Sequence, residues 1–358
     1  MLLRSVLPIS ILSILSCSSS TALGSAPESA ELRGVWIWTA SPPGARGGDW
    51  LQACSWAQSA GFTAVFPCVV YGPLAWLDMD GLLRAPIPGD PDPIEACLEE
   101  AHGLGLEVHA WVVMWKLSAL QDQVADSVAA VMQTQVGANG ESSDWLCPTD
   151  PANRDLEVRI FTALAREYEF DGIQLDYVRF PDGDHCFCDG CRERFAMDSR
   201  LRDLQWPRDV YWGGRYSEQW REWRRSQMTS LVRSIVEAIR IERPGALVSA
   251  QVIPELHEAR ESCGQDWAEW TEEGLLDFIV PMDYVSSDDS FEVLVHDQVA
   301  LSAVPVAPAI GPFDVNADLD LSQVLSRIGT VRSAGCSGFV IFLLKPALVE
   351  MLEGLRVD

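Results

Sequence analysis

The feature that most constrains the fold is a regular alternation of short apolar runs with amphipathic segments, beginning at Leu32. The apolar runs have the length of strands, and segments with helical spacing separate them. The predicted strands are 35–38, 63–70, 107–115, one within 171–181, 247–253, 277–282, 304–309 and 338–344, and the predicted helices are 49–60, 93–104, 118–135, 153–169, 216–242, 267–273 and 321–333. Eight strands alternating with helices indicate an α/β chain that folds as one (β/α)8 TIM barrel with extended βα loops.

Length and charge narrow the class of protein further. The 358 residues suffice for a substantial core, and no internal repeat or linker divides the chain, so the barrel is expected to span 32–350. The formal net charge of −26 argues against a nucleic acid as partner, because no basic stripe could offset the repulsion between the chain and phosphates. Such acidity is more typical of solubility, or of a neutral or cationic substrate.

The first 26 residues have the features of a targeting segment rather than of part of the fold. A short positive start is followed by an apolar run, 6–15, that is too short to span a membrane as a mature helix. That run leads into Cys17 and three serines, which is similar to a bacterial lipoprotein signal in which Cys17 is lipidated; ordinary cleavage near 22–26 is the alternative. We therefore predict export to the periplasm, cell envelope or exterior, with a lipid anchor as the means of membrane attachment.

The stretch Asp171–Pro181, DGIQLDYVRFP, carries an unusual strand. Ile173 and Leu175 alternate with Gln174 and Asp176, so one face of this strand is apolar and the other is polar. A carboxylate where a buried strand ends is typical of a site at the mouth of a parallel barrel. The alternative is that Asp176 only caps the next segment.

Polar and aromatic side chains are also concentrated where the other predicted strands end. In a (β/α)8 barrel these carboxyl ends meet at one rim, and a barrel needs no such residues there for stability. Aromatic rings stack on the C–H faces of sugars, while acids and amides bind the hydroxyls. The predicted contacts with a polysaccharide or oligosaccharide are Trp36, Trp38, Tyr71, His109, Trp111, Trp115, Gln174, Tyr177, Arg179, Gln251 and Tyr284.

Carboxylates at the same rim predict acid–base chemistry on a glycosidic bond. Such cleavage needs a protonated acid for the leaving oxygen and an ionised partner. Asp176 is the first candidate, and Asp283 or Glu255 is its partner. A phosphate-binding glycine loop, a nucleophile elbow and HExxH spacing are all absent from the sequence, so no cofactor is expected for catalysis.

A second cluster follows the strand that ends at Asp176. His185, Cys186, Cys188 and Cys191 place several soft ligands within one turn, and a closed structural Zn²⁺ site needs four such ligands. In an exported protein the alternative is a set of disulfides or free thiols. The sequence thus predicts a structural rather than a catalytic zinc site, and Cys54, Cys68 and Cys97 are interpreted as buried thiols.

Four stretches together resemble a known family: RGVWIWT (33–39), EEAHGLGLEVHAWV (99–112), NRDLEVRIFTALAREYEFDGIQLDYVRFP (153–181) and FIVPMDY (278–284). They are similar to the glycoside-hydrolase-like family 10 barrels, which are bacterial exported or lipoprotein domains. The resemblance runs from about Leu32 to Leu344. It implies a (β/α)8 fold that hydrolyses glycosidic bonds of a polysaccharide, with at least one relative acting on peptidoglycan glycan strands, and it points to Asp176 with Tyr177 and Arg179, and to the rim 281–284.

One departure limits the resemblance. Xylanases of the true family 10 would place a glutamate at the ends of strands four and seven. Here strand four ends in Asp176, and strand seven ends in Ala309-Ile310-Gly311-Pro312 without a carboxylate. We therefore expect an exported glycoside hydrolase that does not use xylanase chemistry, and the alternative is a carbohydrate-binding or cell-envelope barrel without turnover.

Overall fold

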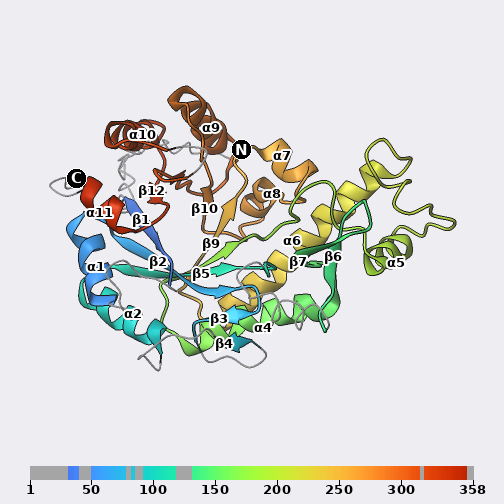
Figure 1. Cartoon of the computed structure of the whole chain (residues 1–358), viewed down its shortest axis with the longest axis horizontal. Helices are drawn as coiled ribbons and strands as arrows, with labels where there is room; N and C mark the ends of the chain where they lie inside the picture. Colours follow the sequence, from blue (N-terminus) through green and yellow to red (C-terminus); the bar gives the residue numbers. More distant parts are fainter. Residues whose placement is uncertain are drawn as a thin grey trace, which may run out of the picture. The chain divides into compact units, whose positions relative to one another are not determined.

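Parallel strands supplied by the predicted apolar runs form the centre of the structure (Figure 1). The computed structural model describes residues 31–39, 50–77, 82–84, 92–117, 131–314 and 318–352, all within the compact unit Glu31–Asp358. The predicted export segment and Cys17 lie outside the described residues. Within the described part of the chain, no helix combines the length and the apolar character that crossing a bilayer requires.

The strands follow one another as a (β/α)8 barrel, which confirms the predicted fold. They are β1 (Leu32–Ile37), β2 (Ala64–Tyr71), β5 (Glu107–Val113), β8 (Gly172–Asp176), β9 (Leu247–Val252), β10 (Phe278–Pro281), β11 (Ala309–Ile310) and β12 (Gly338–Ile341). Their order is β10-β9-β8-β5-β2-β1-β12-β11, with parallel neighbours throughout. A single bridge between Ile279 and Val306 brings the two ends of this order together, so the barrel is nearly closed.

The seventh strand is shorter than the sequence predicts. The predicted run 304–309 contributes only the bridge at Val306 and the start of β11. Pro305 and Pro308 flank that bridge, and proline has no N–H to donate to a ladder, so continuous pairing is interrupted on this side of the barrel.

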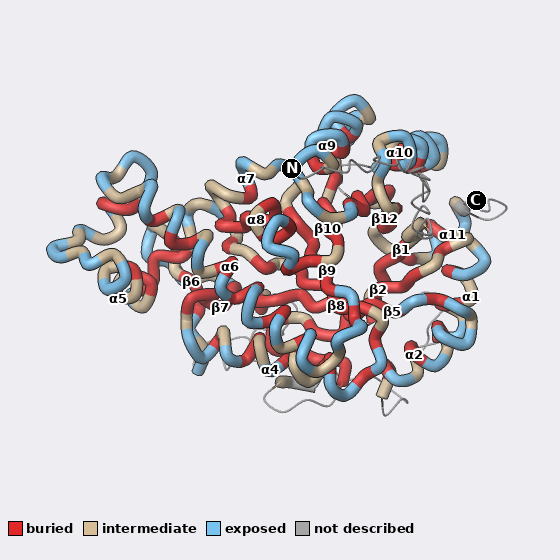
Figure 2. Tube along the Cα trace, turned by 180° about the vertical axis from the view of Figure 1, so that it is seen from behind, coloured by how far each residue is buried: buried red, intermediate tan, exposed pale blue. Residues whose placement is uncertain are grey.

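Helices cover the outside of the barrel, and most begin at a capping residue. Asp92, Asp150 and Asp320 each accept backbone N–H groups at a helix start, and Asp320 forms a capping box with Gln323. The helices are α1 (Trp50–Ser59), α2 (Pro93–Gly103), α4 (Pro151–Glu167), α6 (Ser217–Glu242), α7 (Leu256–Glu261), α8 (Trp267–Glu272), α9 (Asp288–Leu301), α10 (Leu321–Ser333) and α11 (Pro346–Leu352). The buried strands and the inner faces of these helices form the core (Figure 2).

An insertion beside the barrel was only partly predicted. The predicted helix 118–135 is wrong over its last residues, because 134–136 form strand β6 (Thr134–Val136), which pairs with β7 (Ser142–Leu146) around a turn with Gly140 at φ 85°; residues 118–130 lie outside the described part. Helix α5 (Asp189–Asp198) follows β8. The first half of α6 packs aromatic rings against this insertion, notably Trp220 against Phe187, Phe195 and Trp206. A short strand, β3 (Leu74–Ala75), pairs antiparallel with β2 and parallel with β4 (Leu83–Arg84).

The glycine that opens β8 is required by its neighbour in the barrel. Any Cβ at Gly172 would overlap the His109 ring, whose strand pairs with β8 at this register. Asp171, one residue earlier, accepts a hydrogen bond from the Val108 backbone N–H (2.8 Å) and lies 2.9 Å from the His102 ring. The Asp-Gly pair therefore fixes β8 against β5 at its start.

We predict that Gly172→Ala destabilises the barrel by about 1–3 kcal/mol, because the added methyl group forces His109 out of its place. Chemical denaturation of the wild type and the variant measures this difference. Gly329→Ala is the control, since that glycine lies in α10 with open space where a Cβ would be added, and alanine there should leave stability unchanged or raise it. Equal midpoints for the two variants would contradict the steric argument.

Candidate active site

Asp176 ends β8 and lies at the mouth of the barrel. Its Oδ2 accepts the indole N–H of Trp111 at 2.9 Å, and its Oδ1 accepts the backbone N–H of Tyr177 at 2.7 Å. The side chain is 1% exposed, and burial raises its pKa to about 6, against the opposing effects of the Trp111 hydrogen bond, the positive charge of Arg179 and the Tyr177 N–H. The carboxyl group is thus poised to hold or release a proton under mildly acidic conditions.

Beneath Asp176, a polar layer crosses the barrel interior. The Trp36 indole donates to Gln174 Oε1 at 2.7 Å, and Gln174 in turn lies 3.4 Å from the Ser249 hydroxyl. With its amide oxygen turned toward them, Gln251 accepts the N–H groups of Trp36 and Trp111 at 3.3 and 3.0 Å. Trp36 and Gln174 are fully buried, so these two predicted sugar contacts instead support the floor of the site.

Two further predicted contacts also lie away from the rim. His109 is fully buried lower in the barrel, stacked on Phe66 at 4.6 Å between ring centroids and edge-on to Phe278. The reason is its position: His109 pairs with the first residue of β8, not the last. Trp115 follows the end of β5 at φ 65° and is fully buried, so packing leaves it no surface for a ligand.

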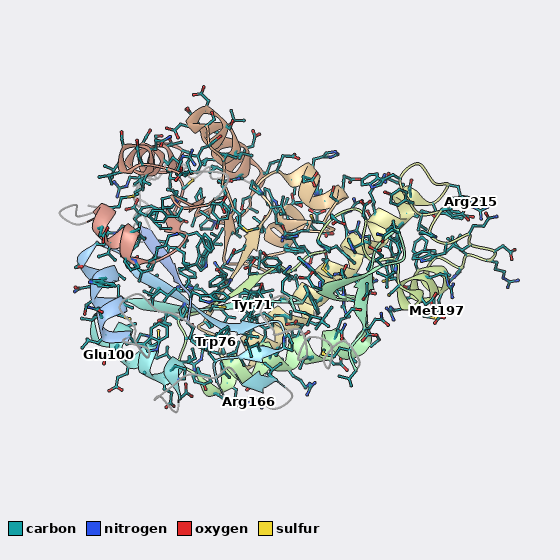
Figure 3. The ribbon with its side chains drawn as sticks, viewed as in Figure 1. Tyr71, Trp76, Glu100, Arg166, Met197 and Arg215 are labelled. Carbon is teal, nitrogen blue, oxygen red and sulfur yellow. The ribbon has the colours of Figure 1, made fainter. Side chains whose placement is uncertain are left out.

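An aromatic group forms one side of the mouth. The rings of Tyr71, Trp76 and Trp111 surround Trp38 with centroid distances of 5.5, 5.7 and 5.8 Å, all close to edge-on. Trp38 and Tyr71 are partly exposed, and Trp111 connects this group directly to Asp176. In Figure 3, Tyr71 and Trp76 lie together over the barrel, far from Met197 and Arg215 in the insertion.

A second aromatic pair with two cations forms the other side. The Tyr177 and Trp145 rings lie 5.1 Å apart, and the Arg179 guanidinium stands over both, at 4.9 and 5.3 Å. Lys116 approaches the Trp145 ring at 4.9 Å. Tyr177 has φ 58°, an uncommon conformation for a non-glycine residue that turns the chain sharply directly after Asp176. Trp145 was not predicted, because it lies in a hairpin rather than in a barrel strand.

The structure separates Asp283 from the mouth. Its Oδ1 accepts the Gln298 side-chain N–H of α9 at 2.7 Å, and its charge interacts with Arg327 of α10, so the carboxyl group lies behind the barrel, among helices. Burial is the main cause that raises its pKa to about 8. The Glu255 side chain caps the start of α7, where it accepts the backbone N–H groups of His257 and Glu258.

Another carboxylate, Asp314 in the loop after β11, lies close to Tyr284. The Tyr284 ring packs on Phe342, with 5.6 Å between the ring centroids. It also lies close to Gly311: a Cβ added to this glycine would be 2.7 Å from the Tyr284 ring and 3.1 Å from the Asp314 Cβ. The pKa of Tyr284 is raised well above its ordinary value by burial and then by the charges of Asp176 and Asp314. The phenol is therefore close enough to both carboxylates to feel their charge. Asp314 was missed because it comes several residues after the predicted strand.

The cysteine cluster lies in the insertion. Cys186, Cys188 and Cys191 come together with Cys147, which follows β7, and their sulfur atoms all lie within 4.8 Å of one another. His185 does not join them: its Nδ1 lies 2.8 Å from Asp182 Oδ1. The structure therefore brings three of the four predicted ligands together and adds Cys147, while His185 pairs with Asp182.

A cavity of about 780 Å³ adjoins His185 on the surface of the insertion. Its walls include three acidic side chains, Glu141, Asp182 and Asp184, together with Ser142, His185 and Tyr211. Neither Asp176 nor the aromatic rim lines this cavity. The buried acid with its N–H donors, rather than this cavity, marks the place where chemistry is expected.

Comparisons with known proteins match this fold to barrels of glycoside hydrolases. The glycoside hydrolase domain of PgaB (BpsB) from Bordetella bronchiseptica superimposes with a TM-score of 0.65 at 13% identity, over 87% of this chain and 94% of that domain. An alpha-L-fucosidase isoenzyme from Paenibacillus thiaminolyticus gives 0.64 at 16% identity, over 90% of this chain and 48% of the fucosidase. At such identities the likeness shows the fold alone.

Sequence comparisons identify the family of this chain. The model of the Glycosyl hydrolase-like 10 family matches residues 63–299, and the chain belongs to this family, as its resemblance predicts. Glycosyl hydrolase DigH of Escherichia coli (strain K12) is 26% identical over 251 residues, which cover 62% of this chain. The matched region spans about half the length of that relative, 52%.

The buried Asp283 predicts a pH dependence of stability. Its pKa is about 8 in the folded protein and about 3.9 when unfolded, so the unfolded chain releases this proton first and stability falls as pH rises from about 4 to about 8. Asp283→Asn should reduce this fall, as measured by denaturation at pH 5 and pH 8. Asp297→Asn, on the exposed side of α9, should leave it unchanged. The same slope in Asp283→Asn and the wild type would contradict the assignment.

Proposed function

We propose that the chain is an active glycoside hydrolase with Asp176 as its general acid. The observation that carries this proposal is a buried carboxyl group at the end of a central barrel strand, with a pKa raised to about 6 and an aromatic rim beside it. Raising a carboxyl pKa by burial is how a glycosidase keeps an acid protonated near neutral pH.

Asp176 would deliver its proton to the glycosidic oxygen. The bond between the anomeric carbon and that oxygen then breaks, and its electron pair leaves with the protonated oxygen. A second carboxylate either attacks the anomeric carbon or removes a proton from the attacking water, so that one water is consumed per bond cleaved. The N–H groups of Trp111 and Tyr177 would stabilise the carboxylate that remains on Asp176.

Asp314 is the partner carboxylate that the geometry favours. It follows the carboxyl end of β11, and it shares the neighbourhood of the Tyr284 phenol with Asp176. Asp283 and Glu255 are occupied by Gln298 and by the start of α7. The Tyr284 hydroxyl, which feels the charge of both acids, would bind a sugar hydroxyl or the attacking water.

The substrate we propose is a polysaccharide or cell-wall glycan outside the cytoplasm. The partly exposed rings of Trp38, Tyr71 and Tyr177 offer stacking surfaces for successive sugar units. An apolar run followed by Cys17 supports export, with attachment to a membrane through a lipid on that cysteine. Family membership and the relative named glycosyl hydrolase support the reaction class.

We expect Asp176→Asn to lower kcat roughly 10²–10⁴-fold, and Asp314→Asn to lower it comparably, because each removes a group that transfers protons or bonds to carbon. Products released from a panel of glycans, peptidoglycan strands included, measure this by mass spectrometry. Asp283→Asn and Glu255→Gln are the matched controls and should retain turnover. Equal cleavage by Asp176→Asn would overturn the assignment, and glycan binding by a wild type that releases no product would favour a carbohydrate-binding barrel.

The pH profile tests the role of Asp176 separately. A general acid works in its protonated form, so kcat/KM should fall as pH rises through about 6. The Trp111 N–H stabilises the ionised form, and Trp111→Phe should therefore raise the pKa and move this alkaline limb to higher pH. Trp38→Phe alters the same aromatic group and should leave the position of the limb unchanged. A limb that does not move in Trp111→Phe would contradict the role of its hydrogen bond.

A further inference from the structure

Four thiols from two parts of the sequence meet in the insertion. Cys147 follows β7, Cys186 and Cys188 lie in the loop before α5, and Cys191 is in its first turn. All four are buried, and every pair of their sulfur atoms lies within 4.8 Å. The Cys147 sulfur is 3.8 Å from that of Cys188 and 3.6 Å from that of Cys191.

These distances match a metal tetrahedron rather than disulfides. A Zn–S bond of about 2.3 Å in tetrahedral geometry places neighbouring sulfur atoms about 3.8 Å apart. A disulfide would require about 2.05 Å between two sulfur atoms. The Cys147 sulfur lies at similar distances from the sulfur atoms of Cys188 and Cys191. This arrangement is that of one corner of a tetrahedron, whereas a disulfide would bring the sulfur close to a single partner.

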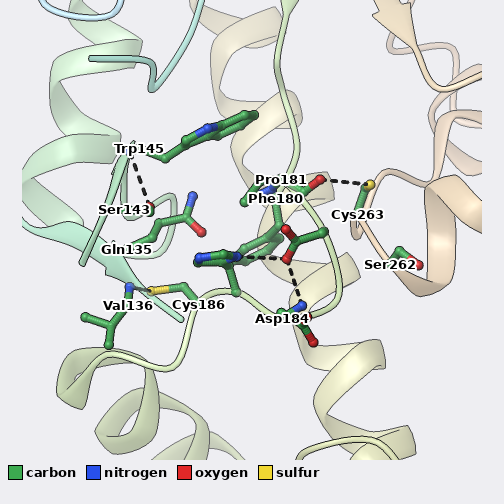
Figure 4. A network of polar contacts seen from close by, with 12 residues as sticks. Gln135, Val136, Ser143, Trp145, Phe180, Pro181, Asp184, Cys186, Ser262 and Cys263 are labelled. Atoms are coloured by element: carbon green, nitrogen blue, oxygen red, sulfur yellow. Dashed lines mark hydrogen bonds and ion pairs between the residues drawn. The ribbon is translucent and has the colours of Figure 1, made fainter. Parts of the chain in front are cut away.

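Hydrogen bonds around the cluster are of the kind that supports thiolate ligands. The backbone N–H of Val136 points at the Cys186 sulfur at 3.4 Å (Figure 4), and the backbone N–H of Cys191 points at the Cys188 sulfur at 3.4 Å. The Thr149 hydroxyl lies 3.1 Å from the Cys191 sulfur and accepts a hydrogen bond from Arg194 at 3.0 Å. Hydrogen bonds of this kind to the ligand atoms orient metal ligands and stabilise their negative charge.

The charges nearby also fit a bound cation with four thiolates. That unit carries a net charge of −2, and Arg154, Arg194 and Arg224 surround the cluster. Arg224 is 1% exposed, and its guanidinium donates to the backbone carbonyls of Asp182 and Ser262 at 2.6 and 2.9 Å. Among the described residues, no carboxylate forms an ion pair with it. A dianionic metal centre would compensate this buried charge.

We propose that Cys147, Cys186, Cys188 and Cys191 bind one Zn²⁺ ion as a closed, structural site. Four protein ligands leave no open position, so the ion takes no part in hydrolysis. Through Cys147 and Cys186 it ties the β6–β7 hairpin to the loop after β8, and through Cys188 and Cys191 it fixes the start of α5. The site would thereby hold the wall of the insertion that carries Trp145 at the barrel mouth.

Metal analysis of the purified full chain tests the ligand set. We expect about one zinc per chain in the wild type and a loss of at least tenfold in Cys147→Ser, with zinc retained in His185→Ala and in Cys336→Ser. Cys336 is the matched control because it is a cysteine outside the cluster. Zinc that survives in Cys147→Ser but is lost in His185→Ala would overturn the proposal in favour of the ligand set predicted from local spacing.

A second measurement does not depend on the folding of a serine variant. Wild-type protein is stripped of metal by a chelator and titrated with Co²⁺, and we expect thiolate-to-cobalt charge-transfer absorption and intense tetrahedral d–d bands that saturate at one equivalent. The melting temperature should fall on stripping and return with Zn²⁺. Absence of these bands, or an intact mass showing the four thiols paired as disulfides after purification with zinc present, would overturn the proposal.

Discussion

Alternation along strand β8 is the constraint on which the rest of the barrel depends. Gly172, Gln174 and Asp176 point inward at successive levels, and each meets a different partner from the other strands. At the lowest level His109 fills the space that the glycine leaves, at the middle level Trp36 binds Gln174, and at the mouth Trp111 binds Asp176. A one-residue slip in register would turn Ile173 and Leu175 inward and remove all three contacts.

Two aspartates near strand ends have different environments because they meet different neighbours. Asp176 lies at the mouth, where burial raises its pKa and the Trp111 and Tyr177 N–H groups limit that rise to about 6. Asp283 lies on the outer side of its strand with Gln298 as a donor and a second oxygen that has no partner among the described residues, and its pKa reaches about 8. The two residues are of the same type, so what separates the candidate catalyst from the buried acid is the number of hydrogen-bond donors at each carboxyl group and the place of that group in the fold.

Helix α6 joins the barrel to the insertion. Its first half packs Trp220 and Trp223 against the aromatic rings of the insertion, and its second half lies against α4 beside β8 and β9. Arg224, between these halves, bonds to carbonyl groups on both sides. The insertion therefore depends on the barrel for much of its packing, and the proposed metal site would fix the part of it that α6 does not cover.

The amino-acid pattern alone predicts the strand and helix order, the barrel, the position of Asp176 and the grouping of three cysteines, because each depends on local periodicity or on spacing within one segment. Helix α10 begins and ends where predicted, since Asp320 and Gln323 form its cap locally. Four outcomes came from the folded chain alone: Asp283 faces α9, His109 and Trp115 are packed, Cys147 rather than His185 joins the other cysteines, and Asp314 lies close to Tyr284. Those outcomes depend on register and helix packing between residues far apart in the chain, and local spacing does not encode such contacts.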